Sequence, residues 1–560
     1  MQNWFPLLRQ LKQYDLNHDL KGDLNAALIV AIMLIPQGMA YAMLAGLPPV
    51  MGLYASTIPL LIYALMGSSR QLAVGPVAMV SLLIFTGVSG LAEPGSNEYI
   101  GYVLLLALMV GVIQFLLGTL KLGFITKFIS HAVISGFTSA AAIIIGFSQL
   151  NHLLGVDTGE SKNVFAILGN VLLDIGDIHL ATLTVGILSI LLLILMKKYV
   201  KKVPGPLFVV ILAILAVQLF DLDERGVTVV GEIPGGLPAL TVPDISVNAL
   251  VILVPTALTI ALIGFVESFA MAKVIATKEK YPISADAELR ALGASNIGTS
   301  FFSGFPVTGG FSRSAVNYEA GARTGMASIF TGLFIVLTLL FFTSWFHDLP
   351  RAVLAAIIIV AVYGLIDLKE AKHLWQVKKI DAVTLMVTFI ATLTIGIELG
   401  ILAGIVFSLT VFVYRSGKPH MAELGYVAEL DDYMNIERFP EAKTQDDILM
   451  IRIDAPVYFA NMAYIEERLR SYMIEHPNLK HVILDFSGVN DMDAVALDEF
   501  NDWLAFHRSQ GVHFYFVLVR GPVRDLFARS GWTKEHQEEF YYHSLAEAMR
   551  NLKNSASKAE

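Results

Sequence analysis

The feature that most constrains this chain is a series of runs of about 20 residues that carry almost no charge. A run of this length and composition is what an α-helix needs to cross a bilayer. Of the 560 residues, 55% are hydrophobic and 16% are charged, a balance that excludes an ordinary soluble enzyme. The chain is therefore predicted to be a polytopic α-helical membrane protein embedded in the lipid bilayer.

We predict fourteen crossings from these runs. They lie at residues 23–44, 50–66, 76–90, 99–120, 127–149, 180–197, 203–221, 248–272, 285–303, 309–321, 323–346, 351–366, 381–397 and 399–414. Seventeen lysines and arginines fall in the turns assigned to the cytoplasm and three in the external turns. Because cytoplasmic loops carry such an excess, this pattern predicts that both termini are cytoplasmic. We expect a multi-pass protein of the plasma (inner) membrane.

These crossings define the predicted domains. They are a cytoplasmic N-terminus (1–22), a first repeat (23–221), an external linker (222–247), a second repeat (248–415), a linker (416–446) and a C-terminal domain (447–555). Residues 1–22 contain no apolar core, so no cleavable signal peptide is expected.

The segment Phe305–Asn317 lies within the membrane but cannot be an ordinary membrane helix. Pro306 and Gly309–Gly310 interrupt any incoming helix, and a new helix can begin at Phe311. Its free N–H groups would lie at membrane depth, with Arg313 in the first turn. Helix N-termini bind anions, and irregular backbone at that depth is tolerated only inside protein or beside a water-filled cavity. This segment is predicted to bind a negatively charged substrate.

A second interrupted segment, Leu72–Val80, has the same form: an extended apolar stretch, then Gly75-Pro76, then a short helix. Taken alone, it also fits a proline-kinked crossing. With seven crossings per half, however, the two breaks fall in the third and the tenth crossing, and an odd number per half inverts the second copy. Interrupted helices at corresponding positions of inverted repeats indicate the central site of a transporter.

The last quarter of the chain has a different character. Strands are predicted at Ile448–Ile453, His481–Phe486 and His513–Val519. Helices are predicted at Ala460–Ile474, Ala494–Gln510, Val523–Arg529 and Ser544–Leu552. None of these is long or apolar enough to span a membrane, so we predict a small cytoplasmic α/β domain.

Several functions are excluded by composition. The chain has no cysteine, its histidines show no ligand spacing, and no nucleophile–base set is present, so we predict neither an enzyme nor a catalytic or metal site. No cofactor is expected, because Gly293, Gly298 and the other paired glycines fit membrane packing rather than a nucleotide loop. The net charge of −9 gives no indication of nucleic-acid binding.

Several motifs of this chain resemble the sulfate permease (SulP) anion transporters, whose animal relatives include prestin and pendrin. The signature lies at Val50–Arg70, with Pro36–Tyr41 and Phe311–Ser314 resembling the first and tenth spans and Gly488–Asp493 a loop of the C-terminal STAS domain. The resemblance implies fourteen spans in two inverted seven-span repeats, packed as a core and a gate domain. It also implies a homodimer and an elevator-type cycle that carries a small inorganic or carboxylate anion.

The same resemblance implies which residues line the substrate site. They are Gln37, Tyr41, Val77, Ala78, Gly310, Phe311, Ser312 and Arg313. Gln37 and Tyr41 share a helix face, although interhelical hydrogen bonding also accounts for them. Ser312 and the amides around it are expected to be direct ligands, with helix capping as the alternative for Ser312. Arg313 costs about 2.5–3.5 kcal/mol at a helix centre, so it should line a cavity and attract the anion.

Glu267 is the carboxylate expected to couple transport to an ion. It lies on a span that is otherwise uncharged from Val251 to Ala272, and burial favours the protonated form of a carboxyl group. Relatives among the sulfate symporters carry an acid at this position. We expect H⁺ as the coupling ion, with Na⁺ as the alternative and Ser268 and Thr308 as further candidate ligands. A structural salt bridge to Arg313 or Lys273 is the competing interpretation.

The predicted function is therefore secondary active transport of a small anion such as sulfate, by proton-coupled symport. Alternatives are sodium-coupled bicarbonate or dicarboxylate uptake, anion exchange, and a nucleobase permease, which Arg313 and the STAS domain disfavour. A protein of another class, a non-transporting sensor that signals through the STAS domain, is also compatible. Phosphorylation of the STAS loop is not expected, because Ala494 occupies the place of the serine that is modified in soluble relatives.

Overall fold

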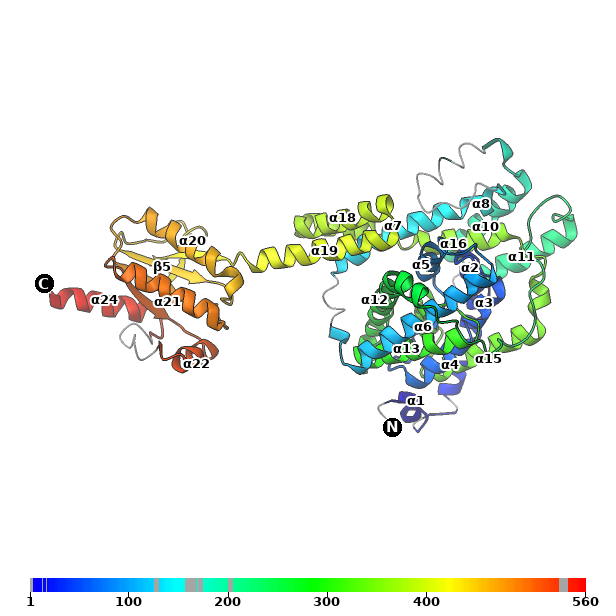
Figure 1. Cartoon of the computed structure of the whole chain (residues 1–560), viewed down its shortest axis with the longest axis horizontal. Helices are drawn as coiled ribbons and strands as arrows, with labels where there is room; N and C mark the ends of the chain where they lie inside the picture. Colours follow the sequence, from blue (N-terminus) through cyan, green and yellow to red (C-terminus); the bar gives the residue numbers. More distant parts are fainter. Residues whose placement is uncertain are drawn as a thin grey trace. The chain divides into compact units, whose positions relative to one another are not determined.

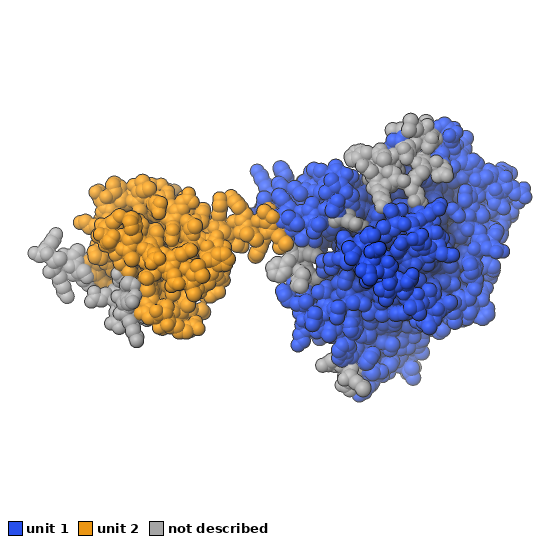
Figure 2. Space-filling view, viewed as in Figure 1, with its two compact units in different colours: residues 1–408 blue, residues 409–560 orange. Residues whose placement is uncertain are grey.

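The computed structural model describes residues 4–12, 14–16, 18–124, 130–156, 169, 175–199, 205–532 and 542–559. The chain divides into two compact units, residues 1–408 and residues 409–560, shown in blue and orange in Figure 2. The first unit is built of helices, and the second contains a five-stranded sheet (Figure 1).

The first unit contains most of the long apolar helices; the starts of the crossings predicted at 127–149 and 203–221 lie outside the described residues. Its helices are α1 (Pro6–Leu11), α2 (Asp19–Leu44), α3 (Pro49–Tyr54), α4 (Ile58–Met66), α5 (Ala78–Val88), α6 (Asn97–Thr119), α7 (His131–Ser148), α8 (Leu150–Leu154), α10 (Leu180–Tyr199), α11 (Gly205–Phe220), α12 (Val247–Lys278), α13 (Ala285–Phe301), α14 (Phe311–Glu319), α15 (Met326–Phe341), α16 (Arg351–Tyr363), α17 (Leu368–Val377) and α18 (Lys379–Ile395). Helix α19 (Ile397–Ser416) begins in this unit and ends in the second. Within the described residues, eight helical segments are long and apolar enough to cross a membrane, and α5, α11 and α15 are shorter apolar helices.

The two interrupted segments have the predicted form. A two-residue strand, β1 (Val74–Gly75), precedes α5, and a second one, β2 (Thr308–Gly309), precedes α14. The helices that follow have 11 and 9 residues, too short to cross a bilayer of about 30 Å at 1.5 Å per residue. Both segments are therefore interrupted rather than continuous membrane helices, which confirms the predicted breaks at Pro76 and Gly309–Gly310.

Glycine allows the close packing that surrounds these segments. α6 packs against α13, and a Cβ added at Gly111 would lie 2.8 Å from the carbonyl oxygen of Gly293. A Cβ at Gly293 would in turn contact the backbone nitrogen of Phe115. No side chain fits between the two helices at this point, so the predicted packing role of Gly293 is confirmed.

A buried carboxylate fixes the turn that leads into β1. Glu288, on α13, is 0% exposed and accepts hydrogen bonds from Tyr63 Oη at 2.6 Å and from Ser68 Oγ at 2.7 Å. The backbone amides of Ser68 and Ser69 donate to the same carboxylate at 2.7 and 3.0 Å. Because a buried charge is stable only when it is fully hydrogen-bonded, these contacts lock the turn after α4 onto α13.

The second unit is an α/β domain. Its sheet has the order β4 (Asp432–Asn435), β3 (Met421–Val427), β5 (Ile448–Ile453), β6 (His481–Asp485) and β7 (His513–Val517). β5, β6 and β7 are parallel, and β3 is antiparallel to β5. The helices are α20 (Phe459–Glu475), α21 (Ala494–Arg508), α22 (Gly521–Arg529) and α24 (Leu545–Ala559). Side chains of α20, α21 and α22 form one apolar core with the sheet, and those of α24 form another.

One part of the predicted domain division is corrected. Residues 416–446 were expected to be a linker, but they contain β3 and β4. β3 pairs with β5 through Met421–Ile453 and so belongs to the sheet. The acidic residues around β3 weaken its apolar pattern, so the sequence did not predict this strand. Glu423 lies within β3 and is itself buried, where the Nε2 atom of His476 lies 3.3 Å from its carboxylate.

Candidate functional site

The two short strands meet and bring the starts of α5 and α14 together. β1 and β2 are antiparallel, with Gly75 opposite Thr308 and Val74 opposite Gly309. Gly75 and Thr308 each lie three residues before the first residue of the following helix. Gly75 and Thr308 therefore occupy equivalent positions, and a local twofold symmetry relates the two half-helices.

Both half-helices begin without a side-chain cap. Their N-cap residues are Val77 and Gly310, and neither offers a side-chain acceptor to the first-turn N–H groups. Val77 and Ala78 are each 6% exposed, so the start of α5 is buried, whereas Phe311 and Ser312 at the start of α14 are exposed. Uncapped N–H groups and the positive ends of two helix dipoles are an arrangement that favours an anion.

Arg313 is buried beside these N-termini, and two of its three nitrogens have no hydrogen-bond partner among the described residues. Its side chain is 3% exposed, and its Nε and Nη2 atoms have no hydrogen-bond partner among the described residues. A Cβ added at Gly75 would lie 3.5 Å from Nη2, and one added at Gly310 would lie 2.7 Å from Cζ. The guanidinium thus folds over Gly310 and faces Gly75. A buried cation that no counter-charge contacts is costly, so this position favours an anion from outside the chain.

Glu267 lies near this arginine but does not neutralise it by contact. It is half-buried on α12, and its Oε2 atom is buried without a hydrogen-bond partner in the part of the chain that the structure describes. Neither Arg313 nor Lys273, both described, forms an ion pair with it within 4.0 Å. Arg313 interacts electrostatically with Glu267 and with Tyr41. The salt bridge considered from the sequence is therefore absent between these described residues.

Gln37 and Tyr41 are buried on α2, each 6% exposed, and lie one turn apart. α2 packs against α5 and α14. It also approaches α3 closely, because a Cβ at Gly38 would lie 3.0 Å from the carbonyl oxygen of Gly52. This packing puts the amide and the phenol among the helices that carry the half-helix N-termini.

The hydroxyl groups of Ser268 and Thr308 are already engaged. They lie 2.5 Å from each other, and each donates to the carbonyl oxygen of Gly264, Ser268 at 2.7 Å and Thr308 at 2.5 Å. Ser268 Oγ also accepts from the backbone amide of Gly309 at 2.7 Å. These bonds tie β2 to α12, and a coupling cation would have to replace part of them.

Two asparagines make hydrogen bonds between segments of the site. Asn296 accepts from the amide of Val307 at 2.7 Å and donates to its carbonyl oxygen at 3.1 Å. Asn317 donates to the carbonyl oxygen of Gln71 at 2.9 Å. Sequence reasoning missed Ser314, whose Oγ accepts from the amide of Ala73 at 2.9 Å. Its only sequence signal is its place beside Arg313 in a helix at membrane depth.

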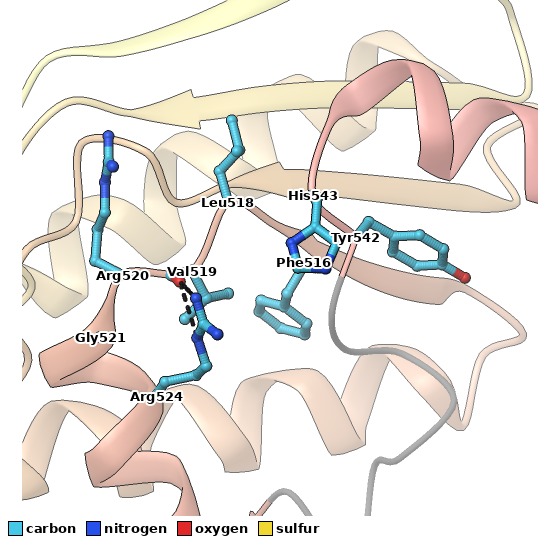
Figure 3. Close-up of a pocket in the computed structure, with 8 residues that line it drawn as sticks. All are labelled: Phe516, Leu518, Val519, Arg520, Gly521, Arg524, Tyr542 and His543. Atoms are coloured by element: carbon cyan, nitrogen blue, oxygen red, sulfur yellow. Dashed lines mark hydrogen bonds between the residues drawn. The ribbon is translucent and has the colours of Figure 1, made fainter.

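The α/β unit contains a separate small cavity of about 220 Å³ at the start of α22 (Figure 3). Arg520, Arg524 and His543 are among the residues that line it. Arg524 donates to the carbonyl oxygen of Val519 at 3.1 and 3.3 Å, drawn as dashed lines. The guanidinium of Arg524 is therefore partly satisfied by the chain itself.

Asp493, in the loop before α21, is also hydrogen-bonded to backbone amides of the same domain. Asp493 is the N-cap of α21 and accepts from the amide of Ala496 at 2.7 Å, and it accepts from the amide of Phe459 at 3.0 Å. Ala494 is the first residue of the helix. An aspartate thus fills the anion-binding end of α21, where alanine leaves no hydroxyl for phosphorylation.

Comparison with known proteins agrees with this architecture. Residues 20–388 match the sulfate permease family, and residues 439–548 match the STAS domain. The chain is 38% identical to sulfate transporter 4.1, chloroplastic, of Arabidopsis thaliana, covering 98% of this chain and 82% of that protein. It is 35% identical to high affinity sulfate transporter 2 of Stylosanthes hamata, covering 90% of this chain and 79% of that protein.

Solved structures share the fold. The structure of SLC26A9 matches with a TM-score of 0.91 at 24% identity, covering 100% of this chain and 94% of that chain. The transmembrane domain of the cyanobacterial bicarbonate transporter BicA matches with a TM-score of 0.60 at 21% identity, covering 70% of this chain and 97% of that domain. The chain is therefore a multi-pass membrane transporter, not an enzyme, and belongs to the sulfate permease family, with a STAS domain at its C-terminal end.

Proposed function

We propose that this chain is a secondary active transporter that takes up sulfate or a similar small oxyanion together with protons. The observation that carries the proposal is Arg313, which is 3% exposed and unpaired at Nε and Nη2 beside two uncapped helix N-termini. Nε and one Nη of a guanidinium form a planar pair of donors that matches two oxygens of an oxyanion. The names of the plant relatives, which are sulfate transporters, support the same substrate class.

In this proposal the anion lies between the starts of α5 and α14. The first-turn amides of both helices donate to it, with Ser312 as a side-chain donor and Gln37 and Tyr41 lining the α2 side. Arg313 supplies the positive charge. Such neutral donors and a single cation hold a divalent anion without neutralising it, so the anion can leave again.

Glu267 is proposed as the proton carrier. Its buried, unpaired Oε2 and its electrostatic interaction with Arg313 support this role. When Glu267 is protonated, Arg313 keeps its full charge for the anion, and when it is ionised, it competes with the anion for the same cation. Proton binding and anion binding therefore favour each other, which is what symport requires.

Sodium coupling is the competing form of this proposal. A sodium ion bound by Glu267, Ser268 and Thr308 would have to take two hydroxyl oxygens that now donate to the carbonyl oxygen of Gly264. That cost supports the proton over the sodium ion.

Three further features belong to the same proposal. The transporter works by an elevator-type movement of a core domain against a gate domain, as the family resemblance implies. It is a homodimer, and it lies in the plasma membrane with both termini in the cytoplasm, in agreement with the placement of lysine and arginine.

The test is uptake by purified protein in liposomes. Labelled sulfate, bicarbonate, chloride and a dicarboxylate are offered separately under an imposed pH gradient or sodium gradient. We expect sulfate to accumulate only with an inward proton gradient, and Glu267→Gln to abolish accumulation while downhill exchange continues. Accumulation with a sodium gradient alone would show that sodium, not the proton, is the coupling ion. A requirement for anion inside the liposomes would indicate an exchanger. No flux of any anion would indicate a sensor.

A further inference from the structure

The hydrogen-bonded contact between the two interrupted segments extends beyond the strand pair. The amide of Gly310 donates to the carbonyl oxygen of Ala73 at 3.0 Å. The amide of Ala73 donates to Ser314 Oγ at 2.9 Å, and Asn317 Nδ2 donates to the carbonyl oxygen of Gln71 at 2.9 Å. Ser314 and Asn317 are 0% and 2% exposed. One face of α14 thus continues the ladder along residues 71–73, which precede the other half-helix.

The opposite half of the site lacks this connection. In the register set by Gly75 and Thr308, the residue equivalent to Ala73 is Pro306, which has no N–H group to donate. Ser81 is the fourth residue of α5, as Ser314 is of α14, and both are 0% exposed. Ser81 Oγ has no hydrogen-bond partner among the described residues. The two serines therefore occupy matching positions, but of these two described residues only Ser314 has a hydrogen-bond partner for its Oγ atom.

The segment before α14 is held in another way. The amide of Val307 donates to Asn296 Oδ1 on α13, not to a side chain of α5. Consequently α14 is bonded through its own side chains to the segment that carries Gly75, whereas α5 is not bonded in this way to the segment that carries Thr308. Since Gly75 faces Nη2 of Arg313, the bonds from Ser314 and Asn317 define how far Arg313 lies from the other half of the site.

We propose that Ser314 and Asn317 are positioning residues for anion transport. They hold the start of α14 and the guanidinium of Arg313 at a fixed distance from Gly75, acting through Ala73 and Gln71, and they do not contact the anion. This inference rests on the proposed binding of an anion between α5 and α14. It adds that the α14 half is pre-organised by side chains and that the α5 half is not.

The first experiment compares Ser314→Ala with Ser81→Ala in purified, full-length protein. The two substitutions remove the same atom from equally buried, matching positions. Losing the acceptor leaves the Ala73 amide unpaired, so we expect Ser314→Ala to raise KM for the transported anion about tenfold and to change the maximal rate less than about twofold. Ser81→Ala should change neither. Equal effects of the two variants, or a loss of maximal rate without a change in KM, would overturn the proposal.

The second experiment does not depend on transport. Amide hydrogen exchange is followed in peptides that cover residues 71–75, and Ser314→Ala should accelerate exchange at Ala73 roughly tenfold while Ser81→Ala does not. An Ala73→Pro variant, which copies the arrangement at Pro306, removes the same donor, so adding Ser314→Ala to it should raise KM no further. Additive effects would contradict the assigned bond. If the wild type transports no anion but Ala73 exchanges as expected, the proposed function fails and the assigned bond stands.

Discussion

The guanidinium of Arg313 lies against the Cα of Gly310, so that a Cβ at residue 310 would be 2.7 Å from both Cζ and Nη2. The N-cap of α14 must therefore be glycine if Arg313 is to keep this position. Gly310 has an ordinary extended conformation, with φ of −85° and ψ of 126°, so the requirement concerns space and not backbone strain.

Gly310→Ala should displace Arg313 without unfolding the protein. The group in the way is the far end of a flexible side chain, which can move. We expect KM for the anion to rise at least about tenfold, equivalent to about 1.4 kcal/mol, with little change in melting temperature. Gly101→Ala on α6 is the matched control, because a Cβ there meets nothing within 4 Å. A normal KM in Gly310→Ala would show that the position of Arg313 does not matter.

Replacing Arg313 should separate stability from transport. Because Arg313 is buried and unpaired at Nε and Nη2, Arg313→Leu removes a buried charge that no counter-charge contacts, and it should leave the stability of the protein unchanged or raise it. The same variant should lose anion accumulation. Thermal unfolding in detergent and uptake in liposomes measure the two effects. If Arg313→Leu unfolds at a lower temperature than the wild type in anion-free buffer, the arginine has a structural partner and the site is misassigned.

Sulfate itself should stabilise the wild type in the same assay. A ligand at 100 times its Kd stabilises a protein by about 2.7 kcal/mol. We expect the melting temperature to rise with sulfate at constant ionic strength, and not to rise in Arg313→Leu. Equal shifts in both proteins would indicate a general salt effect.

Glu288→Ala should destabilise the first unit. The substitution leaves Tyr63 Oη and the amides of Ser68 and Ser69 without an acceptor, which costs about 3 kcal/mol or more. Glu98→Ala is the control, since Glu98 is exposed and, among the residues that the structure describes, accepts only from Tyr102 Oη at 3.1 Å. Its effect should lie within about 0.5 kcal/mol. Comparable melting temperatures of the two variants would contradict the role of Glu288.

Asp493→Ala should loosen the start of α21. Loss of an N-cap costs about 1 kcal/mol, and the amide of Phe459 loses its acceptor as well. Hydrogen exchange of residues 494–497 in the full-length chain should accelerate about tenfold, whereas Asp498→Ala, at an exposed position on the same helix, should leave it unchanged. Unchanged hydrogen exchange in Asp493→Ala would show that Asp493 does not stabilise the start of α21 as its N-cap.

Much of the architecture follows from short-range signals. The hydropathy of each run predicts a membrane helix, and the breaks at Pro76 and Gly309–Gly310 are found where the sequence puts them. β5 is found at the predicted residues because a dense apolar run marks a strand buried on both faces. β3 was missed because the acids in and around it weaken that signal, and its place is decided by pairing with β5.

The sequence alone predicts a membrane-spanning chain, two segments interrupted at Pro76 and Gly309–Gly310, and Arg313 in the first turn of the helix after the second break. Those properties depend on neighbouring residues, through solvation of the backbone and the conformations open to proline and glycine. Which groups those helices contact depends on the packing of the folded chain. Ser314 accepts from Ala73, 241 residues away, and Arg313 forms no ion pair with Glu267, because packing of distant helices sets these contacts and no local pattern encodes them.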